Sequence, residues 1–569
     1  MVPKASFGVF LSLFLHIANG HEGTEPMQPD HKYAEDRAHM VLNAIHSAGR
    51  LFGSALYHNG FGFFPATVPA GTLFYHGAER NVTPTGPEWL AFDIEHSEAF
   101  AMSYRSRRGK GRHPVAPPPD KHKSEGEEDL REEEFREELR RRSEHGNAEN
   151  TRDHSGYPVD DNDPVNHRGY LHMYQTTREL NLLLLDGMSA GKTYMGTLDS
   201  QDLVLREGKG NGRSFDEWNR ASDLCKIASE WGLDGFVRME IGVEIIKCDF
   251  SNGLNLVNMM RTELRNYTMN DQDLSMFQWI RGVGERYDGI GGGRLRIDFS
   301  SMVSGLFFPI NISSTDPERP DLKRLGAATM TELIDIKAYL KDVLHQPRRF
   351  TVDWQGVVDL IVSRYSKRIA LMAYEPLPSR HFINEVLGTT STWFNAPPLP
   401  DDISLAEQKN TNRTANAIEE CRRHYLRPAH VFKDKWSVED ELIYTSLDTV
   451  LSTICNTLYL VRGRLLEAST AHLSGLTSKD DESYEKLERA VEHGRSMVQQ
   501  LMSELGWTTW KKPQACAPDE LSSIAMWPFG TEEDHWHPGC RSIDVVQHPN
   551  GTYWDHRLPK PDDRDDLSI

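Results

Sequence analysis

The stretch LNLLLLDGMSAGKTYMG, residues 180–196, decides how this sequence is interpreted. Four consecutive leucines lead into Asp186 and Gly187, and the tripeptide Gly-Lys-Thr follows at 191–193. A phosphate-binding P-loop needs a glycine, four further residues and then Gly-Lys-Thr, because backbone N–H groups must surround the phosphates before a helix begins. Asp186 stands where that first glycine is required, and its carboxylate would repel a phosphate. The stretch therefore predicts a buried strand and a turn, and not a nucleotide-binding loop.

Length, charge and the N-terminus restrict the class of protein. The chain has 569 residues, enough for two or three domains. Its net charge of −20 argues against nucleic acid or an anionic membrane surface as the main partner. Residues 1–20 predict a secretory signal peptide, with Lys4 before a short apolar run and small residues at 18–20. No later stretch holds about 18 uninterrupted apolar residues, so we expect a secreted, extracellular protein without a membrane span.

Glycosylation acceptors and cysteines fit an exported protein. Asn-x-Ser/Thr triplets begin at Asn81, Asn266, Asn311, Asn412 and Asn550. Six cysteines without CxxC spacing predict up to three disulfide bonds. Cys225 with Cys248 is the first pair we expect, because both lie in one compact unit. For each cysteine a free buried thiol is the alternative.

The segment 104–165 loses the hydrophobic pattern and is dominated by charged residues. Such a composition cannot offset the conformational entropy that ordering would cost. We therefore expect a charged, disordered insertion between two elements of one domain. A partner-binding arm is the alternative.

The remaining sequence changes from a mixed pattern to a helical one. Strands are expected at 71–77, 89–92, 170–176, 180–186, 235–240 and 243–250. Helices are expected at 95–104, 220–232, 352–374, 437–469 and 484–505. These patterns predict an α+β domain over 21–320, an α-helical domain over 321–515 and an irregular C-terminal tail over 516–569.

Three stretches carry a resemblance to a known family. GTLFYHG (71–77) is a strand that ends in a His-Gly pair, and PEWLAFDIEHSEAFA (87–101) is a strand, an acidic turn and a helix. WGLDGFVRMEIGVEIIKCDF (231–250) holds two strands, the second with Glu244 near its start. In this order, the stretches resemble the ADP-ribosyltransferase-like fold in its His–aromatic–Glu branch, which includes the poly-ADP-ribose polymerases. The resemblance covers roughly residues 65–255 without the insertion, and it leaves the helical half unexplained.

The resemblance implies a split β-sheet domain that uses NAD as a substrate. It implies that Glu244 stabilises the positive charge that develops on the ribose as the nicotinamide–ribose bond breaks. It also implies that His76 binds the adenosine-side ribose and that Gly77 presents its backbone to the carboxamide. Trp89 would stack near the nicotinamide, and Phe92 is the alternative aromatic residue, since the family's usual tyrosine is absent here.

The surroundings of Glu244 raise a question of their own. Glu244 alternates with Ile246, Cys248 and Phe250, which places its carboxylate on the more apolar face of a strand. Burying an unpaired carboxylate is costly, so either a functional cleft, an arginine partner or a solvated strand end must account for it. Gly242 stands where a Glu-x-Glu motif would need its first glutamate. The pattern of arginine-modifying enzymes is therefore absent, and the ADP-ribose acceptor is undetermined.

The predicted function is NAD-dependent transfer of ADP-ribose or NAD glycohydrolysis. A non-catalytic secreted glycoprotein that acts as a binding module is the alternative from another class. A third reading is a metal-dependent secreted hydrolase built around His535, His537 and Cys540 near the C-terminus. Because HxH-x2-C is no standard ligand set, we expect tail histidines and a disulfide there, and no metal site.

Overall fold

The computed structural model describes residues 26–57, 60–107, 164–192, 197–209, 216–266, 279–282, 289–290, 293–317, 319–395, 412–474, 481–512, 515–526 and 530–542. The signal peptide predicted at 1–20 lies outside the described residues, as do Asn550 and residues 108–163 of the charged insertion.

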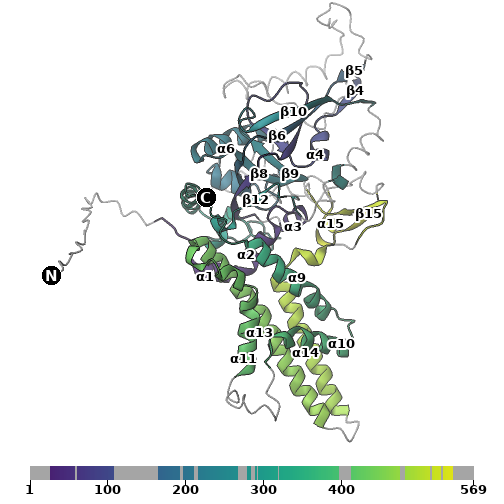
Figure 1. Cartoon of the computed structure of the whole chain (residues 1–569). Helices are drawn as coiled ribbons and strands as arrows, with labels where there is room; N and C mark the ends of the chain where they lie inside the picture. Colours follow the sequence, from purple (N-terminus) through teal and green to yellow (C-terminus); the bar gives the residue numbers. More distant parts are fainter. Residues whose placement is uncertain are drawn as a thin grey trace, which may run out of the picture.

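A large mixed sheet forms the centre of the N-terminal half (Figure 1). Its ten strands are β1 (Gly62–Val68), β2 (Leu73–Ala78), β3 (Glu88–Ala91), β6 (Tyr170–Thr176), β7 (Leu180–Leu185), β8 (Gly235–Glu240), β9 (Gly242–Lys247), β10 (Leu254–Arg261), β12 (Arg296–Ile297) and β13 (Val303–Ser304). The order is β10-β6-β2-β3-β9-β8-β7-β1-β12, with β13 also paired to β1. All neighbours are antiparallel except β7 and β8.

The leucine-rich stretch forms the interior strand β7, as predicted. It pairs with β1 on one side and with β8 on the other, and its four leucines are buried. A strand that is covered on both faces has no solvated side, which accounts for its continuous apolar run. The chain turns directly after it, at Gly187, whose φ of 70° favours glycine.

The sheet is almost divided between β2 and β3. A single residue pair, Tyr75 with Ala91, joins these two strands, whereas β2 and β6 share six pairs and β3 and β9 share four. The strands β10, β6 and β2 thus form one part of the sheet, and β3 with the remaining strands forms the other. The predicted motifs on β2, β3 and β9 lie on three adjacent strands across this division.

Helices cover both faces of the sheet. The helix α6 (Glu217–Trp231), the π-helix η1 (Ser200–Leu205) and the short helix α4 (Ile94–Glu98) lie on one face. We call this face the acidic face, because the Glu244 side chain projects from it. The helix α3 (Leu51–Leu56) lies on the other face, which we call the α3 face. A glycine ends α6, at the end of the range expected for this helix: Gly232 has a φ of 68°.

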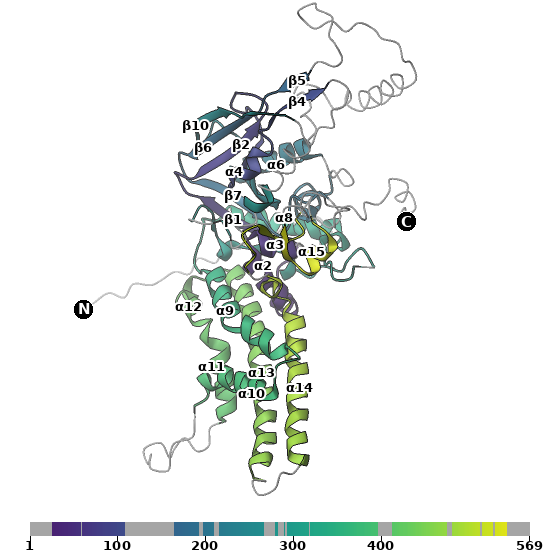
Figure 2. The ribbon, with the colours of Figure 1, turned by 90° about the vertical axis from the view of Figure 1, so that its right-hand side faces the viewer.

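The C-terminal half is helical. Its helices are α8 (Met330–Leu344), α9 (Trp354–Ala373), α10 (Ser379–Thr390), α11 (Arg413–His424), α12 (Arg427–His430), α13 (Val438–Ser474) and α14 (Asp481–Leu505). The two longest, α13 and α14, run side by side away from the sheet (Figure 2). A capping box begins α13, since Ser437 and Asp440 exchange side-chain to backbone hydrogen bonds of 3.0 Å.

Contacts and a shared hydrophobic cluster cross the boundary expected at residue 320. The first helices, α1 (His31–Asp36) and α2 (Ala38–Ser47), pack against α13, and α2 also packs against α9. They lie at the junction between the sheet and the helices in Figure 1. One hydrophobic core continues from the sheet into the helical half. Sequence periodicity marks where helices occur but carries no information about which distant segment they pack against.

Two other expectations need correction. The helix expected over 95–104 ends at Glu98, and β4 (Ser103–Arg107) then pairs with β5 (Pro164–His167), so strands lie on both sides of residues 108–163. The segment expected to be an irregular tail contains β14 (Glu520–Ser523), α15 (Glu532–Trp536) and β15 (Gly539–Ser542). A capping box at Thr531 and Asp534 supports that short helix. A further short strand, β11 (Leu264–Asn266), pairs with β4 and so belongs to the same small sheet as β4 and β5.

Three disulfide bonds join all six cysteines. The expected pair, Cys225 with Cys248, links α6 to the end of β9. The others are Cys421–Cys455 and Cys516–Cys540. No helix in the described part of the chain has both the length and the apolar run that crossing a bilayer would require.

Candidate functional site

Glu244 is buried at the centre of the sheet and is held by an arginine. The β8–β9 hairpin pairs Glu240 with Gly242 next to its turn and Arg238 with Glu244 two positions further along. Cross-strand partners project to the same face, and Arg238 donates to Glu244 Oε1 from Nε at 3.1 Å and from Nη2 at 2.5 Å. Glu244 is only 4% exposed and Arg238 1%. An arginine partner is therefore one answer to the cost of burying this carboxylate.

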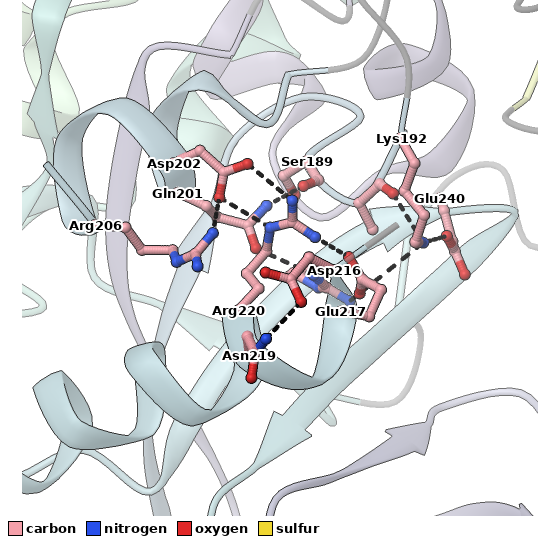
Figure 3. Close-up of polar contacts among 12 residues, drawn as sticks. Ser189, Lys192, Gln201, Asp202, Arg206, Asp216, Glu217, Asn219, Arg220 and Glu240 are labelled. Carbon is pink, nitrogen blue, oxygen red and sulfur yellow. Dashed lines mark hydrogen bonds and ion pairs between the residues drawn. The ribbon is translucent and has the colours of Figure 1, made fainter. Parts of the chain in front are cut away.

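Further charged groups lie next to this pair, and Figure 3 shows Lys192, Glu217 and Glu240 among them. Arg238 Nη2 also donates to Glu217 Oε2, at 2.7 Å. Lys192, from the Gly-Lys-Thr tripeptide, donates to Glu240 Oε2 at 2.7 Å and lies 4.0 Å from Glu217. The lysine of the apparent P-loop thus holds a carboxylate of its own chain.

The π-helix η1 supplies the next polar layer. Gln201 Oε1 accepts from Arg238 at 3.1 Å, and Asp202 accepts two hydrogen bonds from Arg220 at 2.8 and 2.9 Å. Arg220 also pairs with Glu217, and Arg206 donates to Asp202 at 2.9 Å. π-helical turns are rare and are found mostly at functional sites. Here the turn directs Gln201 toward Arg238 of β8 and Asp202 toward Arg220 of α6.

His96 is the imidazole nearest to Glu244. It belongs to α4, is 3% exposed, and places Nε2 3.8 Å from Glu244 Oε2. Its Nδ1 is buried, and no described residue offers it a partner that meets hydrogen-bond geometry. A Cβ at Gly242 would lie 2.4 Å from this Nδ1, so the glycine makes room for the ring.

We call the buried cluster of Glu244, Arg238, Glu217, Lys192, Glu240 and His96 the centre. Burial and charge have opposite effects on the pKa values of its acids. Burial raises the pKa of Glu244 to about 7, although Arg238 acts to lower it. Burial also acts to raise the pKa of Glu217, but Arg238, Lys192 and Arg220 together lower it to about 2. Burial lowers the pKa of His96, which favours the neutral ring. Near pH 7 the centre thus holds one ionised acid, Glu217, beside a second acid, Glu244, whose pKa lies close to the pH.

His76 and Glu244 lie on opposite faces of the sheet. Tyr75 pairs with Ala91, and Ala91 pairs with Glu244, so these three side chains share the acidic face. His76 follows Tyr75 and therefore points to the α3 face. There its Nδ1 lies 2.8 Å from the Trp89 carbonyl and its ring packs against His172. The expected convergence of imidazole and carboxylate is thus not observed for His76.

The other predicted site residues are also divided between the faces. Trp89 lies on the acidic face and packs edge-on against Trp218 of α6, with ring centroids 4.7 Å apart. Phe92 is buried on the α3 face against Phe74. Gly77 packs under the end of α4, since a Cβ there would lie 2.3 Å from the Ser97 carbonyl oxygen. Its missing side chain therefore serves close packing.

A shallow pocket lies on the α3 face beside this centre. Leu51, Phe92, Asp93, Val243 and Arg294 line it, and its empty volume is about 270 Å³. That figure includes space open to solvent, so the enclosed part of the pocket is much smaller. The pocket is therefore too small to enclose a whole dinucleotide.

Three side chains of the centre could hold a metal ion. One ligand atom each of His96, Glu240 and Glu244 lies within 4.8 Å of the other two, and all three residues are buried. The C-terminal candidates are arranged differently: Cys540 forms a disulfide with Cys516, and His535 is buried in α15.

Glu244 and Trp89 could be chosen as candidate site residues from the sequence, whereas their neighbours could not. Arg238 stands in the middle of an apolar strand, and a buried arginine requires an acid. Counting outward from a tight turn at Ile241 would have placed it opposite Glu244. His96 and Lys192 gave no such signal, because each reaches the centre from a separate element.

A sequence-family model matches the part of the chain that contains these residues. The family described as YPL277C N-terminal domain matches residues 32–275, which include every residue of the centre named above. No solved structure matches the chain.

Two proteins of Saccharomyces cerevisiae are similar to the chain. One, described as "Uncharacterized protein YOR389W", is 26% identical over an alignment that covers 88% of this chain and 84% of that protein. The other, "Uncharacterized protein YPL277C", is 33% identical over 40% of this chain and 43% of its own length. The similarity to the first relative thus extends beyond the sheet into the helical half.

Proposed function

We propose that this chain is a secreted enzyme that breaks the nicotinamide–ribose bond of NAD, with Glu244 as the carboxylate that faces the ribose. The bond between ribose C1′ and the nicotinamide nitrogen breaks, and its electron pair leaves with nicotinamide. An acceptor or water then adds to C1′ and releases a proton. The products are nicotinamide and either an ADP-ribosylated acceptor or free ADP-ribose.

One observation carries this proposal: a buried, firmly oriented carboxylate stands on β9, one of the three adjacent strands that carry the resembling motifs. Arg238 holds Oε1 of Glu244, and Oε2 lies 3.8 Å from His96 Nε2. A fixed carboxylate of this kind stabilises a developing ribosyl cation without having to reorganise. The near-division of the sheet between β2 and β3 also supports the split-sheet resemblance.

The structure changes the residues that we assign to the reaction. His96 replaces His76 as the imidazole beside the acid, because only His96 lies on the acidic face near Glu244. Trp89 remains the aromatic residue of the proposal, since it shares that face. His96 is a positioning residue here, because it neighbours the carboxylate.

Secretion is part of the proposal and has its own support. All six cysteines form disulfides, which persist in oxidising compartments. The acceptor residues Asn81, Asn311 and Asn412 are exposed, as glycosylation requires.

A non-catalytic binding protein is the second candidate, and the burial of the centre favours it. Arg238 pairs with Glu244 and Lys192 with Glu240, as charges do in a purely structural ion-pair network. In that case Glu244 would contribute to stability and would not react with a substrate.

Nicotinamide release from NAD separates the two candidates. We expect the secreted, disulfide-bonded protein to release nicotinamide and the Glu244→Gln variant to lose at least about a hundredfold in rate. The variant leaves Arg238 paired with Glu217, so we expect it to fold, which its melting temperature checks. Glu230→Gln, on the exposed side of α6, is the matched control and should retain the rate. Absence of release by the wild-type protein, or full activity of Glu244→Gln, would contradict the proposal.

A further inference from the structure

The β8–β9 hairpin and α4 bring together a set of ligand atoms that suits a metal ion. Glu240 and Glu244 flank the hairpin turn and project from the acidic face, and His96 approaches them from α4. The donor atoms of the three residues lie within 4.8 Å of one another. Two ligands about 2.1 Å from a tetrahedral ion lie roughly 3.4 Å apart, so the donor atoms would have to draw together by up to about 1.4 Å to share one ion.

The His96 ring is a buried polar group whose hydrogen bonds are incomplete. Its Nε2 lies 3.8 Å from Glu244 Oε2, too far for a hydrogen bond and close to the spacing of two ligands on a shared ion. Among the described residues, Nδ1 has no hydrogen-bond partner of acceptable geometry, although the Ile241 backbone is near. Buried polar groups in folded proteins rarely remain unpaired. An ion bound at Nε2, the nitrogen that faces Glu244, would give that side of the ring a partner.

The carboxylates are oriented so that one oxygen of each can serve such an ion. Arg238 occupies Oε1 of Glu244, and Lys192 occupies Oε2 of Glu240. Hydrogen-bonded partners of this kind fix the direction of metal-ligating carboxylates in known sites. Gly242, between the two acids, makes room for the imidazole, because a Cβ there would lie 2.4 Å from Nδ1.

We propose that His96, Glu240 and Glu244 bind one divalent transition-metal ion. One imidazole nitrogen and two carboxylate oxygens suit Zn²⁺ or Mn²⁺. They suit Ca²⁺ poorly, because Ca²⁺ takes six to eight oxygen ligands. The inference goes beyond the NAD reaction and does not rest on it. If both hold, the ion competes with the ribose for Glu244, and Zn²⁺ inhibits nicotinamide release.

Direct binding of Zn²⁺ to the full secreted protein tests this site. After treatment with a chelator, equilibrium dialysis is expected to load one tightly held Zn²⁺ per chain, with a higher melting temperature. His96→Gln should weaken this binding at least about tenfold. His172→Gln is the matched control, because His172 is buried on the α3 face without a carboxylate ligand partner. X-ray absorption should show nitrogen and oxygen ligands that include a single imidazole.

Several outcomes would overturn the inference. They are no tightly held Zn²⁺ in the wild-type protein, equal binding by folded His96→Gln, or a zinc shell of several imidazoles that indicates other histidines. If His96→Gln does not fold, Glu240→Gln replaces it, and the absorption spectrum of the wild-type protein decides independently. Because none of these measurements uses NAD, they remain decisive whether or not nicotinamide release is found.

Discussion

At the scale of single residues, Asp186 is a buried acid outside the centre, directly after the leucine-rich strand. Burial raises its pKa to about 7, even though backbone N–H groups of Gly187, Phe61 and Gly62 favour the ionised form. Its Oδ2 is buried without a hydrogen-bond partner. The Tyr57 side chain is the titratable group that faces it. Asp186, which stands where a P-loop would need a glycine, is therefore a neutral acid in the folded protein at acidic pH.

This pKa predicts a stability that falls with rising pH. The unfolded carboxyl ionises near 3.8 and the folded one near 7. The stabilisation is thus complete below about pH 4 and is lost as the pH rises to 7, by up to about 4 kcal/mol. Asp186→Asn keeps the acceptor for Gly187 and removes the titration. We expect this variant to melt higher than the wild type at pH 8 and similarly at pH 4.

Thermal melting across this pH range provides the check. Asp342→Asn, at an exposed position of α8, should leave the pH dependence unchanged. An Asp186→Asn variant with the same pH dependence as the wild type would show that Asp186 is already ionised in the folded protein.

At the same scale, the sequence could predict which strand residues carry chemistry but not which residues they meet. Glu244 was identifiable because a carboxylate on an apolar strand face needs an explanation. The error over His76 came from treating three strand ends as convergent without a register. One pair, Tyr75 with Ala91, determines that His76 and Glu244 point in opposite directions, and no single sequence encodes that pairing visibly.

At the scale of elements, close packing of α4 on β2 positions His96. Gly77 has no room for a side chain, since a Cβ would lie 2.3 Å from the Ser97 oxygen and 2.8 Å from the Phe100 Cβ. We expect Gly77→Ala to displace α4 and to cost about 1–3 kcal/mol of unfolding free energy, as overpacking does. Because α4 carries His96, this variant should also weaken Zn²⁺ binding.

Urea unfolding measures that cost. Gly388→Ala in α10 is the control, since no atom lies within 4 Å of a Cβ there, and a helical alanine is favoured over glycine. We expect it to be neutral or stabilising. Equal stability of Gly77→Ala and the wild type would mean that α4 does not pack rigidly on the sheet.

Element positions were the most predictable part of the fold. Strands β6, β7 and β8 begin at the expected residues, because their apolar runs are bounded by turn residues. The helix expected at 95–104 was wrong beyond Glu98, since the chain there pairs as β4 with a strand that lies beyond the insertion. Pairing with a distant strand overrides a local helical period.

At the scale of the whole molecule, the sheet and the helical half share one core. Ser446 of α13 donates to the Ala34 carbonyl at 2.9 Å, and Asn43 of α2 donates to the Leu505 carbonyl at 2.9 Å. Gln355 of α9 donates to the Ile45 carbonyl at 2.9 Å. The N-terminal helices thus connect the two halves through buried contacts.

This continuity predicts cooperative unfolding. We expect calorimetry of the disulfide-intact protein to give a single transition, with equal calorimetric and van't Hoff enthalpies. A part covering residues 321–515 alone lacks α1 and α2, so we expect it to remain poorly folded. Two separate transitions, or a stable isolated helical part, would show that the halves are independent domains, as sequence periodicity suggested.

The central claim is that the reaction takes place on the acidic face of the sheet, at Glu244 and beside His96. The most direct measurement compares nicotinamide release from NAD by His96→Gln and His76→Gln, each confirmed to be folded. The account predicts that His96→Gln loses at least about tenfold in rate, whereas His76→Gln stays within about threefold of the wild type. Loss of release in His76→Gln together with full activity in His96→Gln would contradict it.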